Sequence, residues 1–147
     1  MPHEPKDPDF ETRVRANFES QKVMGLIGAR LLRVEPGVVE IDIDARDDLT
    51  QQNGYIHAGI VTTILDSACG YAAYTLMPAN SGVLSVEFKV NLLAPAKGER
   101  IRALAEVKRA GRTLTVCNAD AYAVEGESEV LCATMLATIF CLEPKRS

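Results

Sequence analysis

The segment between residues 58 and 77 restricts the fold of this chain more than any other. It is almost wholly apolar, and Asp66 stands in its middle. Twenty or so apolar residues suffice to cross a bilayer, but an aspartate at mid-bilayer is costly, and no Lys or Arg flanks the segment to set an orientation. A buried strand is disfavoured because the run is too long and rich in alanine. We therefore expect a helix that the rest of the protein covers on nearly all sides.

The residues before this helix predict a short helix and a β-hairpin. A proline follows Asp7, as at many helix starts, and apolar residues then recur at four-residue spacing over 10–18. Residues 27–44 are extended on both sides of a Pro36-Gly37 turn, and the second half alternates apolar with acidic side chains. One face of this hairpin is therefore expected to be solvated.

The residues after the long helix predict a β-sheet. Period-two alternation and turn residues delimit four strands, at 84–92, 101–108, 113–124 and 129–142. These strands can pair antiparallel in the order of the sequence. The expected fold class is α+β, with an antiparallel sheet wrapped around one long central helix. One face of that helix stays open unless a second copy covers it, so we expect a homodimer.

Length and charge narrow the classes of protein and partner. A chain of 147 residues supports one core, and we expect an N-terminal tail and short helix (1–23), one domain (24–142) and a C-terminal tail (143–147). A net charge of −4 without a Lys/Arg cluster argues against nucleic acid and anionic membranes as partners. The polar N-terminus lacks the apolar stretch of a secretory signal, which favours a cytoplasmic location.

The cysteines and histidines predict neither a disulfide framework nor a metal centre. None of the four cysteines is in a C-x-x-C pair, so buried reduced thiols are expected. The two histidines are His3, in an expected disordered tail, and His57. A cluster of metal ligands is hard to assemble from this set.

Asp66 is the residue whose position most needs an explanation. An ionised carboxylate inside an apolar helix is costly unless it is paired, and no Lys, Arg or His lies three or four residues away. Gly70, one turn further on, leaves room for a substrate beside the carboxylate. The alternative is a structural aspartate that is capped by Thr62 or by a backbone N–H from elsewhere.

The loop Asn53-Gly54-Tyr55-Ile56-His57 leads directly into the start of the helix. Unpaired N–H groups and the positive end of the helix dipole point out of a helix N-terminus. The amides of Ala58 and Gly59 are therefore candidates to hold a developing oxyanion. His57 is either part of this chemistry or simply an N-terminal cap.

These residues carry a family resemblance. The pattern Gly54-x-x-His57-Ala58-Gly59 followed by Asp66 resembles the H-G-G…D signature of hotdog thioesterases of the phenylacetate-pathway (PaaI-like) group. The stretches Ser85-Val86-Glu87-Phe88 and Leu93-Ala94-Pro95-Ala96-x-Gly98 are similar to that group's third strand and following turn. The resemblance extends over roughly Gly25 to Leu142, and it rests on these motifs together.

The resemblance implies a hotdog fold whose domains pair side by side into dimers, often into dimers of dimers, with active sites between subunits. The matching carboxylate, Asp66, acts as general base or nucleophile on a thioester carbonyl. The amide that follows the histidine, here that of Ala58, polarises this carbonyl. The family usually has glycine in place of Ala58, and the added methyl group narrows the approach.

Further site residues follow from the same resemblance. A polar side chain six residues before the histidine helps to place water or the leaving group; Gln51 stands there, with Asn53 nearby. Ser85 matches a strand hydroxyl that orients water, although an ordinary solvent-facing serine is the alternative. The candidates to bind the coenzyme A phosphates are Lys89, Arg109 and Arg112, which are otherwise solvated charges.

The function implied is hydrolysis of an acyl-CoA thioester without a cofactor or metal. A thiolate is a good leaving group, so one carboxylate with one or two amide donors is enough. The aliphatic, alanine-rich helix favours a medium or long acyl chain, and an aryl acyl group is the alternative. Two rivals on the same fold are a non-catalytic acyl-CoA binding module and a hydratase or dehydratase.

Overall fold

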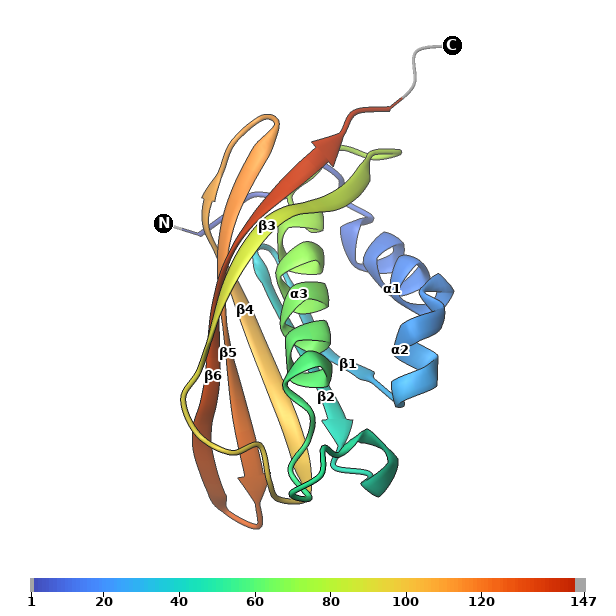
Figure 1. The fold of residues 1–147 in the computed structure, drawn as a ribbon. Helices are drawn as coiled ribbons and strands as arrows, with labels where there is room; N and C mark the ends of the chain where they lie inside the picture. Colours follow the sequence, from blue (N-terminus) through green and yellow to red (C-terminus); the bar gives the residue numbers. More distant parts are fainter. Residues whose placement is uncertain (1, 145–147) are drawn as a thin grey trace.

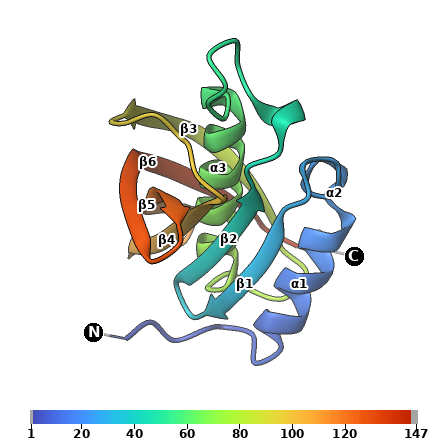
Figure 2. The ribbon, with the colours of Figure 1, turned by 90° about the horizontal axis from the view of Figure 1, so that it is seen from below.

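The computed structural model describes residues 2–144, so residues 145–147 of the expected C-terminal tail lie outside the described residues. One long helix, α3 (Ala58–Tyr74), lies against a six-stranded antiparallel sheet (Figure 1). The strands are β1 (Arg30–Glu35), β2 (Val38–Asp44), β3 (Gly82–Leu92), β4 (Arg100–Ala110), β5 (Leu114–Glu125) and β6 (Ser128–Leu142). The predicted fold class is confirmed, and the sheet curves around the helix (Figure 2).

The core forms where α3 meets the middle of the sheet. Ile64 and Leu65 are fully buried there, and such burial contributes about 1.5–3 kcal/mol for each side chain. The sheet presents mostly small side chains to the helix, and these allow a close approach; they are Ala103, Ala105, Ala119, Ala121, Ala133 and Ala137. The side of α3 that faces away from the sheet is only partly covered, and Gly59, Thr63, Asp66 and Gly70 lie along it.

The predicted order of strand pairing is wrong for β3. The strand order is β1-β2-β4-β5-β6-β3, so β3 pairs with β6 and not with its neighbour in sequence, β4. The hairpins β4-β5 and β5-β6 close through short turns, and β4 also pairs with β2. Both sides of β4 are therefore occupied, and α3 carries the chain across the sheet to the free side of β6.

The N-terminal segment also differs from the prediction. Helix α1 (Phe10–Ser20) begins three residues after Asp7, and a second helix that the sequence analysis did not predict, α2 (Lys22–Ile27), ends at the first residue of the expected extended run. Gly28 ends α2 with a positive φ of 72°. A glycine in this left-handed conformation is a common end of a helix. His3 is not in a loose tail, because its ring touches Gly37 and its Nε2 lies 3.3 Å from the Val107 carbonyl oxygen.

Arg13 fastens α1 to the end of α3. Its guanidinium binds Asp7 at 2.9 Å and donates hydrogen bonds to the carbonyl oxygens of Tyr74 and Met77. A cation at a helix C-terminus satisfies carbonyl groups that have no partner inside the helix. The two N-terminal helices thus lie on the side of α3 away from the central strands (Figure 1). Within residues 2–144 no helix is long and apolar enough to span a membrane.

Candidate active site

His57 caps the N-terminus of α3. Its extended backbone, with φ −58° and ψ 137°, turns the ring back so that Nδ1 accepts a hydrogen bond from the Gly59 N–H at 2.8 Å. A neutral imidazole that accepts through Nδ1 carries its proton on Nε2. The His57 side chain thus forms the N-terminal cap of α3. The Gly59 amide, one of the two predicted oxyanion donors, is occupied by this cap.

The amide of Ala58 stays available. Among the groups of residues 2–144, none accepts a hydrogen bond from the Ala58 N–H. The amides of Ile60 and Val61, by contrast, both donate to the His57 carbonyl oxygen. The Ala58 N–H is therefore the donor that points out of the helix start, where the dipole favours negative charge.

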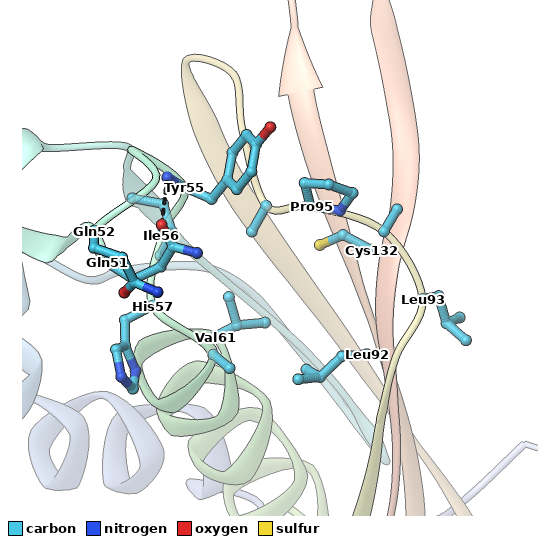
Figure 3. Close-up of a pocket in the computed structure, with 13 residues that line it drawn as sticks. Gln51, Gln52, Tyr55, Ile56, His57, Val61, Leu92, Leu93, Pro95 and Cys132 are labelled. Atoms are coloured by element: carbon cyan, nitrogen blue, oxygen red, sulfur yellow. Dashed lines mark hydrogen bonds between the residues drawn. The ribbon is translucent and has the colours of Figure 1, made fainter.

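The loop before α3 borders a groove. The Gln51 N–H donates to the Tyr55 carbonyl oxygen at 2.8 Å, and the Gln51 Oε1 accepts from the Asn53 N–H at 2.6 Å. The groove measures about 510 Å³ and lies between this loop, the start of α3 and the end of β3 (Figure 3). Gln51 and Ala58 are in its wall, Asn53 is not, and the His57 ring turns away from Leu92 (Figure 3).

Asp66 and Ser85 are brought together from α3 and β3. The Ser85 hydroxyl donates to Asp66 Oδ1 at 2.6 Å. Thr62 does not cap Asp66, because its hydroxyl donates to the Ala58 carbonyl oxygen. A short hydrogen bond from one hydroxyl fixes the carboxylate and leaves its second oxygen open, as a general base or nucleophile requires.

The two halves of the predicted machinery lie apart within one chain. Ala58 and Asp66 are eight residues apart on a continuous helix, which corresponds to about 12 Å along its axis. The carbonyl oxygen must lie within hydrogen-bond distance of its oxyanion donor, and the general base must reach the water that attacks the same carbonyl carbon. This separation along the helix axis is large for two groups that are expected to act on the same thioester.

Cys69 and Cys117 are poorly suited to act as nucleophiles. Burial raises the pKa of the Cys69 thiol, and it raises the pKa of Cys117 to about 12. Both thiols are fully buried and keep their protons near neutral pH. No group of three His, Cys, Asp or Glu side chains among residues 2–144 is placed to hold a metal ion.

The predicted coenzyme A-binding residues lie away from the Ala58 end of the same chain. Arg109 is nine residues beyond Arg100 on β4, about 30 Å along the strand, while Arg100 is at the end near the loop that precedes α3. Arg112 is exposed and pairs with Glu143 at 3.3 Å. Lys89 lies opposite Leu136, on the face of the sheet away from α3.

A second cavity adjoins Asp66 and includes residues that the sequence analysis missed. It measures about 270 Å³, and Asn17, Gln21 and Tyr71 are in its wall beside Asp66 and Gly70. Asn17 and Gln21 belong to the N-terminal helical segment, about 50 residues before Asp66. No local sequence pattern predicts that these two residues lie beside Asp66, because their position depends on how α1 packs against α3.

Comparison with known proteins decides the family. A sequence profile of the Thioesterase superfamily matches residues 53–130, more than half of the chain. The chain belongs to the thioesterase superfamily. Acyl-coenzyme A thioesterase 13 of Homo sapiens is 31% identical over 105 residues, which cover 71% of each chain.

Solved structures agree with this assignment. A thioesterase family protein from Silicibacter pomeroyi is 52% identical, with a TM-score of 0.89 over 90% of this chain and 98% of that one. The PaaI protein of E. coli, from the phenylacetic acid degradation operon, has a TM-score of 0.84 over 95% of this chain and 97% of that one. At 13% identity, PaaI shows that the fold is shared. The predicted hotdog fold and the thioesterase class are thus confirmed, and the reaction class is thioester hydrolysis.

Proposed function

We propose that this thioesterase hydrolyses acyl-CoA at a site shared by two copies of the chain. One copy supplies the Ala58 amide and the loop around Gln51, and the other supplies Asp66 and Ser85. The observation that carries the proposal is the separation of about 12 Å between Ala58 and Asp66 on one rigid helix. If two α3 helices lie antiparallel along their exposed sides, the Ala58 of each approaches the Asp66 of the other.

The chemistry divides between these groups. The thioester carbonyl oxygen accepts from the Ala58 N–H, which stabilises the negative charge that develops when the carbonyl carbon is attacked. Asp66 either removes a proton from the attacking water or attacks the carbon itself, giving an anhydride that water then cleaves. The C–S bond breaks with its electron pair on sulfur, and the products are the free acid and the coenzyme A thiol. Ser85 holds Asp66 in position throughout.

The sheet edge supports the same assembly. The outer strand β3 exposes Val86 and Phe88 at 57% and 41%, and it is adjacent to the open side of α3. Pairing of β3 with its copy would cover these side chains and lay the two α3 helices side by side. In that arrangement the Arg109 and Arg112 end of one chain faces the Ala58 end of the other, which makes them candidates for the coenzyme A phosphates. A dimer of such dimers is the larger assembly that we propose.

The first test is complementation between two inactive variants. Ala58→Pro deletes the proposed donor with little strain, since proline is favoured at the first position of a helix and His57 already has the extended backbone that proline requires before it. Asp66→Asn removes the carboxylate. Each variant alone should lose activity. In a mixed dimer one site receives both defects and the other none, so random refolding of equal amounts should restore roughly a quarter of wild-type activity.

Free coenzyme A release is the readout, and the controls separate the alternatives. Ala58→Gly keeps the amide, so it should keep activity where Ala58→Pro loses it. If verified subunit exchange leaves the mixture at the background of its parents, the shared site is wrong. A wild-type protein that binds acyl-CoA but releases no coenzyme A would instead support the binding module. The hydratase is less supported, because the His57 Nδ1 is taken by the Gly59 amide.

A further inference from the structure

A polar network forms part of the wall of the cavity beside Asp66. The Tyr71 hydroxyl accepts from Gln21 Nε2 at 2.7 Å and donates to Asn17 Oδ1 at 3.0 Å. The Ser67 hydroxyl donates to Gln21 Oε1 at 3.1 Å. Two turns of α3 are thereby connected to the junction between α1 and α2. Burial raises the pKa of Tyr71, so its hydroxyl keeps a proton to donate.

The network keeps hydrogen-bonding capacity toward the cavity. An asparagine amide has two N–H donors, and among residues 2–144 none accepts from Asn17 Nδ2. The Tyr71 oxygen has a second lone pair beyond the one that Gln21 occupies. An apolar group pressed against these atoms would remove their access to water without replacing it, which is costly.

The size of the cavity limits what it can hold. At about 270 Å³ the cavity is roughly half the size of the 510 Å³ groove beside Ala58. Gly70 contributes to this space, because a Cβ there would meet no atom within 4 Å. A cavity of this size favours a short acyl group over a chain of sixteen carbons. The alanines of α3 do not enlarge the cavity, since Ala68, Ala72 and Ala73 are buried against the sheet.

The groove beside Ala58 and the cavity beside Asp66 suit the two parts of an acyl-CoA thioester, the coenzyme A arm and the acyl arm. The arm that continues to the coenzyme A nucleotide must reach solvent, and the 510 Å³ groove beside Ala58 runs past the exposed residues Gln52 and Pro95. The cavity beside Asp66 is smaller, and Asn17 and Gln21 are in its wall. The acyl arm therefore belongs in the cavity beside Asp66.

We infer that Asn17, Gln21 and Tyr71 select a short acyl group that carries a hydrogen-bonding substituent, such as a hydroxyl, at its far end. This inference rests on the proposed acyl-CoA hydrolysis and names its substrate class. Asn17 and Gln21 lie outside the residues 53–130 that match the family profile, so they are features of this chain's N-terminal helices. The alanine-rich helix had favoured a medium or long apolar chain, and the polar network reverses that preference.

Turnover of matched substrates tests the inference. Hexanoyl-CoA and 6-hydroxyhexanoyl-CoA differ by one hydroxyl, and palmitoyl-CoA tests the limit on length. The wild type should prefer the hydroxylated substrate in kcat/KM by about tenfold or more, as expected for one additional satisfied hydrogen bond. Palmitoyl-CoA should be the poorest of the three. In Tyr71→Phe and Gln21→Met, which remove polar atoms at nearly constant volume, the ratio of the two hexanoyl substrates should fall toward one.

Glu19→Gln, an exposed change on α1 two residues before Gln21, is the matched control and should leave the ratio unchanged. Equal turnover of the two hexanoyl substrates by the wild type, or an undiminished ratio in both variants, would overturn the inference. The wild-type ratio decides even if a variant does not fold. If the wild type hydrolyses none of the three substrates, the proposed acyl-CoA hydrolysis fails; hydrolysis without selectivity contradicts only the role of this network.

Discussion

The two edges of the sheet are built differently. Edge strand β1 has six residues, and its charged side chains are paired: Arg30 binds Asp42 and Asp44, and Arg33 binds Glu35. Edge strand β3 has eleven residues, and the large apolar side chains exposed along it are Leu84, Val86, Phe88 and Leu92. Short, charged edges resist pairing with another chain, whereas long apolar edges invite it.

The difference between the edges indicates where a second copy binds. Strand β1 has α1 beside it, and its paired charges would have to be stripped of water to form a new contact. Strand β3 lies next to the open side of α3, and the hydrogen bond between Ser85 and Asp66 joins the two elements. The exposed edge and the candidate catalytic carboxylate thus belong to one surface.

The largest effect is expected from a charge placed on the β3 edge. Phe88 and Leu32 are exposed to nearly the same extent, 41% and 44%, on opposite edges. Phe88→Lys should convert the assembly to monomers of 16.0 kDa and reduce activity to background, because each site loses the other copy's half. Light scattering and coenzyme A release measure the two effects.

Leu32→Lys is the matched control, and it should keep both the wild-type mass and the wild-type activity. A wild-type protein that is itself monomeric at micromolar concentration would remove the basis of the shared site. The same conclusion follows if Phe88→Lys becomes monomeric yet remains fully active.

The sequence predicts that β3 is a strand, but it does not predict that β3 is an edge strand. The alternation over 84–92 predicts β3 to within two residues, since period-two patterns are local. The same pattern is typical of a half-buried strand anywhere in a sheet, so it does not say that β3 is an edge. The pairing of β3 with β6 is set by contacts about 50 residues apart in sequence.

In the candidate site too, some features follow from the local sequence and others depend on the folded structure. The start of α3 at Ala58 and the carboxylate of Asp66 follow from helix signals and from the cost of burying a charge. An N-terminal cap was one of the two interpretations of His57, but that its ring binds the Gly59 amide depends on backbone angles that the sequence does not display. Likewise, Ser85 reaches Asp66 just before an irregularity in the pairing of β3 with β6, between Ser85 and Glu87, which alternation alone does not predict.

The next largest effect comes from comparing two carboxylates. Asp66 is half-buried and bonded to one hydroxyl, whereas Asp42, on β2 beside β1, is 3% exposed and binds both Arg30 and Arg100. Asp66→Asn should reduce kcat by about a hundredfold or more, the scale for losing a general base, with little change in the free energy of unfolding. Asp42→Asn should leave kcat of the folded protein unchanged.

The cost of Asp42→Asn should appear in stability. Losing charge-assisted hydrogen bonds to the two arginines should reduce the free energy of unfolding by about 1–3 kcal/mol, measured by urea denaturation. If Asp66→Asn keeps wild-type turnover while its stability falls, Asp66 is structural, as the alternative interpretation of the sequence holds.

The smallest effect is expected from the hydroxyl that positions Asp66. Ser85→Ala removes the 2.6 Å hydrogen bond to Asp66 Oδ1 but leaves the carboxylate and the strand in place. Because β3 is exposed, the loss should be near the lower end for a charge-assisted hydrogen bond, about 1.4 kcal/mol, which is roughly tenfold in kcat.

Thr134→Val is the control, since its hydroxyl makes a similar bond to Asp120 at 2.7 Å on the opposite face of the sheet. Ser85→Thr keeps a hydroxyl and should recover most of the activity. A Ser85→Ala loss as large as that of Asp66→Asn would mean that Ser85 itself touches the substrate or water, and no loss would mean that the carboxylate is positioned by the second copy of the chain.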